Sequence, residues 1–179
     1  MNPVRVIVLF AILAVAATPA DKTIAIPAGE TVTGRCVGVH DGDSLTIILN
    51  TPEGTRQAKI RLDGIDAPEL GQPFARVSRA GLAEMVFERE CAVESRGADK
   101  YGRTIGRVSV DAADVNAAML DSGLAWHYKR YDSRPDMAAR EEASKAAKIG
   151  LWESADAIPP WEWRKMPSES RREAVGASK

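Results

Sequence analysis

The stretch TVTGRCVGVHDGDSLTIILNTPEGTRQAKIRL, residues 31–62, decides the fold. Apolar and polar residues alternate along Ser44–Asn50 and again along Thr55–Leu62, the pattern of β-strands with one buried face. The preceding Thr31–His40 is typical of a further strand, and the intervening TPEG of a tight turn. The stretch therefore predicts three strands in a meander. We expect Arg61 to project from the face of the third strand opposite its core side chains.

The residues after the meander predict a helix and two further strands. From Pro73 to Arg89 the apolar residues recur at helical spacing. Cys91–Glu94 and Arg103–Val110 predict two short strands, joined by a loop that contains residues 99–102. The apolar stripe expected on the helix comprises Phe74, Val77, Gly81, Leu82 and Met85.

Two more helices complete the predicted elements. Asp114–Ser122 predicts a short helix with Asp114 as its N-cap, and a longer helix is expected from about Pro135 to Gly150. In the longer helix, Glu141 and Lys145 have the spacing of an i,i+4 ion pair.

The resulting element order, β-β-β-α-β-β-α-α, predicts the fold class. A three-stranded meander, a helix and two more strands are the chain order of the OB-fold, the five-stranded Greek-key barrel that binds oligonucleotides. Order alone also permits other α+β folds. We expect an α+β, mainly β protein: a five-stranded OB-fold-type Greek-key barrel with about three flanking helices.

Length, charge and cysteine content narrow the class of protein. The 179 residues, 45% hydrophobic and 27% charged, are typical of one soluble globular domain. Two cysteines and two histidines do not complete a closed structural zinc site. The net charge of −1 excludes the broad basic surface of a DNA-coating protein, so any contact with nucleic acid must be local.

The first 20 residues predict a secretory signal peptide. Arg5 precedes an apolar run from Val6 to Ala17, and small residues offer cleavage sites. A spanning helix needs about 20 apolar residues, so an uncleaved anchor is the weaker interpretation. We expect an exported protein, periplasmic or secreted, with no stable membrane span. The domain organisation is then a signal peptide at 1–20, a linker at 21–30, one domain at 31–165 and a disordered tail at 166–179.

Export also bears on the two cysteines. An oxidising compartment permits Cys36 and Cys91 to pair. They lie in the predicted first and fourth strands, which are neighbours in a barrel of this type. A disulfide between them is one interpretation, and two separate buried thiols are the other.

Three short segments carry residues that point to chemistry. By themselves, DGDS (Asp41–Ser44) is a hairpin turn, RLDGIDAPE (Arg61–Glu69) could equally be a solvated loop, and DKYGR (Asp99–Arg103) could be a charged turn. Together they supply what hydrolysis of a phosphodiester requires: hard oxygen ligands for a divalent ion, bidentate arginines and a base. The residues in these roles are Asp43 and Asp66, Arg61 and Arg103, and Glu69.

In this order, the segments resemble the thermonuclease, or staphylococcal-nuclease-like, family over nearly all of residues 31–165. The resemblance implies an OB-type barrel with flanking helices, and a calcium-dependent nuclease that acts on DNA and RNA and leaves 3′-phosphorylated products. The matching motifs are VHDGDS (Val39–Ser44), RLDGIDAPE (Arg61–Glu69), DKYGR (Asp99–Arg103), DVNAAMLDSGLA (Asp114–Ala125) and GLW (Gly150–Trp152).

The resemblance implies a calcium site. Asp43 and Asp66 match the family's calcium-ligating aspartates, and Ala67 matches the position whose main-chain carbonyl completes the protein ligands. The family often has threonine at this position. Because the carbonyl is the ligand, we expect alanine to preserve Ca²⁺ binding.

The same match implies catalytic residues. Arg61 and Arg103 match the family's catalytic arginines, and Glu69 matches its catalytic glutamate, commonly assigned as general base. Trp161 and Trp163 belong to a W-E-W-R ending seen in many bacterial members, and we interpret them as packing anchors.

Four further residues are implied as substrate contacts. Lys100 and Tyr101 match positions that contact a nucleotide phosphate. Tyr128 and Tyr131 fall near the family's substrate-contacting tyrosines, with packing of the last helix as the alternative.

The sequence thus predicts a monomeric, exported nuclease of low sequence specificity, with Ca²⁺ as cofactor and DNA, RNA or both as substrate. A non-catalytic nucleic-acid-binding or scaffold module on the same barrel is the alternative. A periplasmic barrel for small ligands or peptides is a second, but it leaves Arg61 and Arg103 unexplained. A purely binding module has no reason to keep the two aspartates, two arginines and glutamate together.

Overall fold

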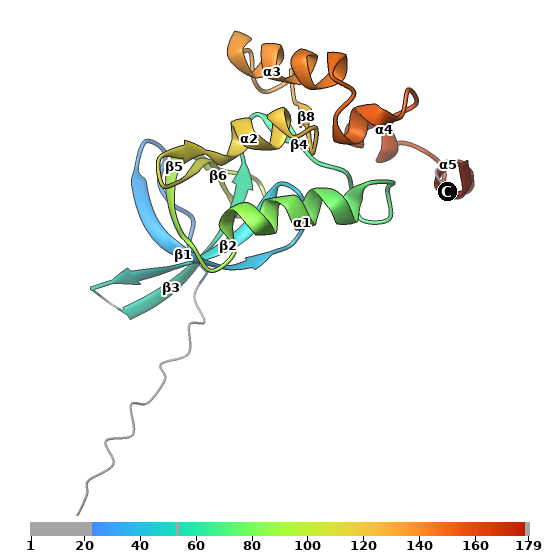
Figure 1. Ribbon diagram of the computed structural model, residues 1–179. Helices are drawn as coiled ribbons and strands as arrows, with labels where there is room; N and C mark the ends of the chain where they lie inside the picture. The colour runs from blue at the N-terminus through green and yellow to red at the C-terminus, as the bar shows by residue number, and fades with distance from the viewer. Residues whose placement is uncertain (1–22, 53, 178–179) are drawn as a thin grey trace, which may run out of the picture.

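The computed structural model describes residues 23–52 and 54–177, so the expected signal peptide lies outside the described residues. Five strands form a closed barrel (Figure 1), which confirms the predicted fold class. The barrel strands are β1 (Thr31–Val39), β2 (Ser44–Thr51), β3 (Gly54–Leu62), β5 (Glu90–Ala98) and β6 (Thr104–Val110).

The barrel closes where β3 pairs with β6. The other pairings between barrel strands are antiparallel, whereas these two run parallel, with Ile60 opposite Thr104 and Leu62 opposite Gly106. A Cβ atom on Gly106 would lie 2.8 Å from Val93 Cγ1 of β5, so the closure leaves no room for a side chain there. Inside the barrel, side chains of alternate residues form the core, among them Leu45, Ile47, Ile60 and Leu62.

Helices and three very short strands accompany the barrel, and the helices lie above it and to its right in Figure 1. They are β4 (Ile65–Asp66), α1 (Ala75–Val86), β7 (Ala113–Asp114), α2 (Val115–Asp121), β8 (Trp126–His127), α3 (Pro135–Ala146), the 3-10 helix η1 (Gly150–Glu153), α4 (Pro160–Trp163) and α5 (Ser168–Ala177). Asp114 caps α2 as predicted, because its carboxylate accepts a hydrogen bond from Ala117 N–H at 3.1 Å. The predicted pair of Glu141 and Lys145 in α3 forms at 3.0 Å. Across the described ranges, no helix combines the length and apolar character that a membrane crossing needs.

The buried face of α1 differs from the predicted stripe. Ser78, Leu82 and Val86 are the buried positions, whereas Val77 is 50% exposed. Part of the predicted stripe is confirmed, because Leu82 is buried and Phe74 and Met85 are partly buried against the core. Ser78 can be buried because its hydroxyl donates to the carbonyl of Leu124 at 2.7 Å.

The C-terminal tail is helical where the sequence predicted disorder. Helix α5 covers Ser168–Ala177, and its polar sequence lacks the apolar stripe by which a helix is recognised. Arg171 Nη2 donates to the carbonyl of Arg164 at 2.9 Å, and the Arg171 guanidinium lies over the ring of Trp163. These contacts tie the helix to the preceding segment. Trp163 is itself buried, which confirms it as a packing anchor.

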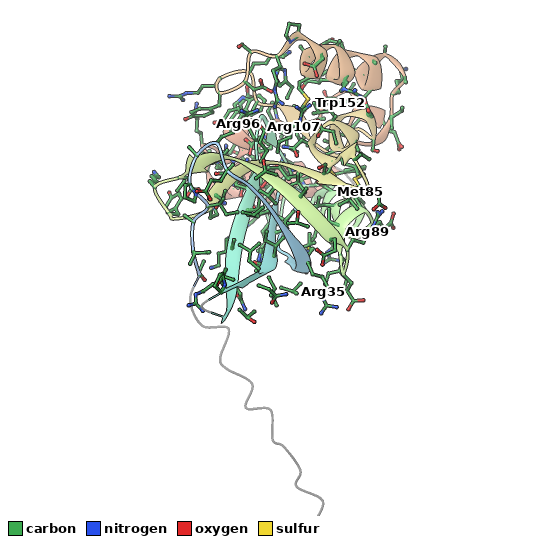
Figure 2. All side chains as sticks on the ribbon, turned by 90° about the vertical axis from the view of Figure 1, so that its left-hand side faces the viewer. Arg35, Met85, Arg89, Arg96, Arg107 and Trp152 are labelled. Carbon is green, nitrogen blue, oxygen red and sulfur yellow. The ribbon has the colours of Figure 1, made fainter. Side chains whose placement is uncertain are left out.

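Several arginines on the outside of the barrel are neutralised locally. Figure 2 shows Arg89, Arg96 and Arg107 on the strands and their connections. Arg89 pairs with Asp111 at 2.6 Å, and Arg107 with Asp114 at 2.7 Å. Because these charges are paired, the outside of the barrel does not form a continuous basic surface there, in agreement with the near-neutral sequence.

The predicted disulfide is not present in the structure. Cys36 and Cys91 are two buried free thiols on β1 and β5. Cys91 lies opposite Gly34, so Cys36 is its diagonal neighbour across the strand pair. The two thiols lie close enough to interact, but no bond joins them. A hydrogen bond with Cys91 lowers the pKa of Cys36 to about 7, against the opposing effect of burial.

We expect thiol titration of the denatured, unreduced protein to find two thiols per chain, because both cysteines are free thiols in the structure. The fully reduced protein is the control and should give the same number. A result of no free thiol before reduction would show that β1 and β5 shift to allow the bridge.

Candidate active site

All ten residues that the sequence assigned to catalysis, metal or substrate line one cavity of about 850 Å³ at one end of the barrel. We call it the catalytic cavity. The two cysteines lie elsewhere, in the barrel wall. The ten residues are Asp43, Arg61, Asp66, Ala67, Glu69, Lys100, Tyr101, Arg103, Tyr128 and Tyr131.

The loop between β1 and β2 presents Asp43. Asp41 Oδ1 accepts the N–H of Asp43 at 3.0 Å, which closes a local turn, and Ser44 Oγ donates to Asp43 Oδ1 at 3.0 Å. A Cβ atom on Gly42 would overlap Ser78 Oγ of α1, so only glycine lets the loop approach the helix this closely. The turn and the helix together hold the Asp43 carboxylate in a buried position.

The segment after β3 presents Asp66. Gly64 adopts a φ of +75°, and a Cβ atom there would overlap the Asp132 carboxylate and Arg134. Beyond this glycine, β4 pairs with β8, with Asp66 opposite Trp126. The short strand pair therefore fixes Asp66, whose side chain is 2% exposed.

Arg61 joins the two aspartates. Its Nη1 lies 3.0 Å from Asp43 Oδ2, and its Nη2 donates to Asp66 Oδ1 at 2.8 Å. Nη1 also donates to the carbonyl of Ile65 at 3.0 Å, so backbone holds the guanidinium in place. Since one guanidinium reaches both carboxylates, the two face a common point.

Burial leaves Asp43 with an unfavourable negative charge. Burial raises the pKa of Asp43 to about 7, and this effect exceeds the opposing effect of Arg61. The N–H of Ala67 donates to Asp43 Oδ2 at 2.7 Å and favours the charged form. A further cation at this point would stabilise the carboxylate.

The loop before β6 presents Arg103. Asp99 Oδ1 accepts the N–H groups of Tyr101 at 2.8 Å and Arg103 at 3.0 Å, and Asp99 Oδ2 accepts Arg103 Nε at 2.7 Å. Burial raises the pKa of Asp99, but these hydrogen bonds outweigh it and hold the pKa below its usual value. Lys100 and the 72% exposed Tyr101 extend from the same loop.

Arg164 is a site residue that sequence reasoning missed. Arg164 is the residue directly after α4. Its Nη2 lies 2.8 Å from Asp66 Oδ2, and its Nη1 pairs with Glu69. Asp66 thus contacts two arginines, Arg61 and Arg164, and Glu69 forms an ion pair with Arg164. The W-E-W-R ending contains Arg164, but we interpreted this segment only as a packing element. Arg164 lies far from the other motifs in sequence, so nothing local linked it to the site.

The two tyrosines line the cavity as a pair. The rings of Tyr128 and Tyr131 meet edge to face, 4.8 Å between centroids, and Tyr131 is 69% exposed. Tyr128 also stacks in parallel on Trp161 at 5.3 Å. Tyr131 is therefore open to a substrate, and Tyr128 joins the cavity to α4.

The charges of the cavity fit a divalent cation. Its lining contains six carboxylates and four cationic side chains, a surplus of two negative charges. Among residues 23–52 and 54–177 no three His, Cys, Asp or Glu side chains gather as a metal cluster. Asp43 and Asp66 would therefore hold a cation with main-chain and water oxygens, a ligand set that suits Ca²⁺.

Comparisons with known proteins agree with this geometry. A protein named ParB from Escherichia coli is 35% identical over 92% of this chain and 97% of its own length. A micrococcal nuclease from Shigella flexneri is 33% identical over 79% of this chain and 86% of its own. A probable staphylococcal-like nuclease from Oryza sativa subsp. japonica is 38% identical over 67% of this chain, which spans only 32% of that protein.

The matched region includes most of the catalytic cavity. The family model described as "Staphylococcal nuclease homologue" matches residues 59–154, from β3 to η1. The loop with Asp43 precedes this range, and Arg164 follows it. With more than half of the chain matched, the protein belongs to the staphylococcal nuclease homologue family.

Proposed function

We propose that this nuclease is exported, depends on Ca²⁺ and cleaves DNA and RNA with low sequence specificity to give 3′-phosphorylated products. One observation supports the proposal: the two aspartates, two arginines and glutamate converge on one cavity. The catalytic cavity has an acidic surplus, so a divalent cation would favour the entry of a phosphate. Family membership supports the nuclease activity itself.

Asp43 and Asp66 would hold the cation at the point that Arg61 now occupies. When bound, Ca²⁺ stabilises negative charge on the phosphate. Arg61 and Arg103 present guanidinium groups to the equatorial oxygens, where charge accumulates as water attacks. Glu69, once released from Arg164, would orient that water and accept its proton. Phosphorus gains the water oxygen as its bond to the 5′-oxygen breaks; the 5′-oxygen takes a proton from solvent water, and Glu69 returns the proton that it accepted to solvent.

The ion pairs of the site must rearrange for this chemistry. Arg61 contacts both proposed metal ligands, and Arg164 contacts Asp66 and Glu69. Asp43 and Asp66 would exchange these pairs for the cation, which would leave the guanidinium groups free to contact phosphate. Release from Arg164 likewise frees Glu69 to accept a proton.

A module that only binds nucleic acid is less compatible with this cavity. Its six carboxylates would repel phosphate, and a binding site has no need of them. Export is proposed from the N-terminal sequence. The molecular mass of the protein recovered outside the cytoplasm shows whether the first 20 residues have been cleaved off.

Ca²⁺ should activate cleavage of single-stranded and duplex DNA, and excess chelator should abolish it. The variant Asp43→Ala, Asp66→Ala should lose both cleavage and calorimetric Ca²⁺ binding, because the two converging carboxylates are gone. Glu84→Ala removes an exposed carboxylate on α1 and serves as the control. Undiminished cleavage in chelator would contradict the proposal, and product-end analysis should find 3′-phosphates.

Arg61→Lys and Arg103→Lys should each lower turnover by roughly 10²-fold or more, because lysine keeps the charge but loses the bidentate fork. Thermal unfolding shows whether folding is intact. Arg107→Lys, which lies outside the cavity and pairs with Asp114, should cleave normally. Near-normal turnover of Arg103→Lys would show that Arg103 is a surface charge without a catalytic role.

A further inference from the structure

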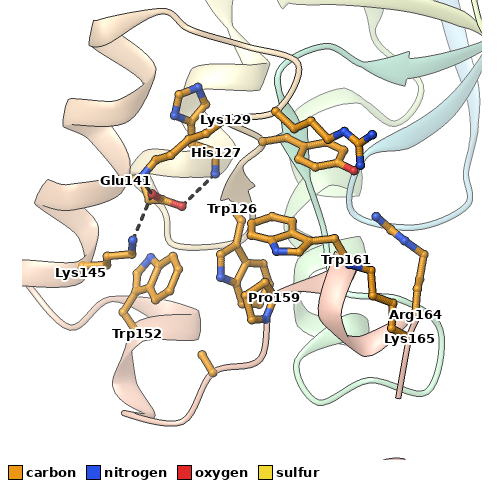
Figure 3. A pocket seen from close by; sticks show the side chains of 13 residues that line it. Trp126, His127, Lys129, Glu141, Lys145, Trp152, Pro159, Trp161, Arg164 and Lys165 are labelled. Atoms are coloured by element: carbon orange, nitrogen blue, oxygen red, sulfur yellow. Dashed lines mark hydrogen bonds and ion pairs between the residues drawn. The ribbon is translucent and has the colours of Figure 1, made fainter. Parts of the chain in front are cut away.

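A second cavity of about 650 Å³ adjoins the catalytic cavity (Figure 3). Its walls come from β8, the loop after it, α3, η1 and the α4 segment. We call it the aromatic pocket. Tyr128 and Arg164 line both cavities, so a ligand can extend from one into the other. In Figure 3, Trp126, Pro159 and Trp161 lie in the middle, with Lys145 on one side and Arg164 and Lys165 on the other.

Aromatic rings give the pocket flat apolar surfaces. Trp126 and Trp152 meet edge to face at 5.4 Å, and Trp161 lies parallel to Tyr128 with an angle of 2° between the rings. Trp126 is buried, but Trp161 and Trp152 are only partly buried. Rings of this kind are platforms on which nucleobases stack.

The charge of the aromatic pocket is opposite to that of the catalytic cavity. Its lining contains one carboxylate, and that of Glu141 is already bound by Lys129 and Lys145, each at 3.0 Å. Burial raises the pKa of Glu141, but hydrogen bonds from these lysines outweigh it and hold the pKa below its usual value. The pocket therefore suits an anion. Its five cationic side chains are Lys129, Arg130, Lys145, Arg164 and Lys165. Lys129 and Lys145 pair with Glu141 and Glu142, and Arg164 pairs with Asp66 and Glu69, so Arg130 and Lys165 carry the positive charge that is open to an anion.

Flat apolar walls combined with cations match a nucleotide, which carries a flat ring and a phosphate. The volume lies within the usual range of ligand pockets, about 300–1,000 Å³. We propose that the aromatic pocket binds an unpaired nucleobase and its adjoining phosphate, in the same strand whose scissile phosphodiester lies in the catalytic cavity. The base must be unpaired because a base inside a duplex is stacked on its neighbours and cannot enter a recess. This inference rests on the proposed function.

The test compares two single strands with the same backbone. One is a 12-mer of thymidylate, and the other is a 12-mer of abasic deoxyribose phosphate. Trp161→Ala should raise KM for the thymidylate strand by about tenfold, the scale of one lost stacking contact, with kcat little changed. Cleavage of the abasic strand should not change. Trp161→Phe should restore KM, because a phenyl ring also stacks.

Lys165→Ala tests the phosphate contact without removing an aromatic ring. Lys165 is exposed, so folding should be unaffected. Its loss should weaken binding of both strands and reduce the slope of log affinity against log salt by about one. Lys59→Ala, an exposed lysine on β3 outside both cavities, is the matched control and should bind like the wild type.

Binding of labelled strands, measured by fluorescence anisotropy in chelator, separates the inference from the proposed function. Failure to cleave either strand contradicts the nuclease, whereas base-dependent binding that Trp161→Ala removes still supports the pocket. An equal effect of Trp161→Ala on both strands, or none on either, overturns the inference. An equal effect on both strands would mean that Trp161 supports Tyr128 structurally and does not contact a base.

Discussion

Closure of the barrel through the parallel pairing of β3 and β6 is the constraint on which the site depends. It sets Arg61 opposite Ile105, two residues beyond Arg103, although the two arginines belong to distant segments of the chain. Without this closure, the loops after β3 and before β6 would not face the same cavity.

The balance of carboxylates and cationic side chains in the catalytic cavity then determines what the site can bind. Asp43 and Asp66 are buried and Arg61 contacts both, but the effect of burial on the pKa of Asp43 still exceeds the effect of Arg61. The cavity nevertheless keeps a surplus of carboxylates. In a purely structural ion-pair network the positive and negative side chains would balance, whereas a site that accepts a divalent cation needs carboxylates in excess of its own cationic side chains.

The two neighbouring cavities divide the recognition of a nucleic acid by charge. The acidic one suits a cation, and the basic, aromatic one suits a base with its phosphate. Arg164 stands between them, paired with Asp66 and Glu69 while lining both. The C-terminal segment is therefore part of the site, in addition to the packing role indicated by Trp163.

Local sequence determined the strands, the α2 cap at Asp114 and the loops that carry the reactive residues, because alternation and capping act within a few residues. Family motifs identified residues that converge on one cavity. Only tertiary structure decided which face of α1 is buried, the diagonal placement of Cys36 and Cys91, and the reach of Arg164. These depend on strand register and on contacts between distant segments, which no local pattern encodes.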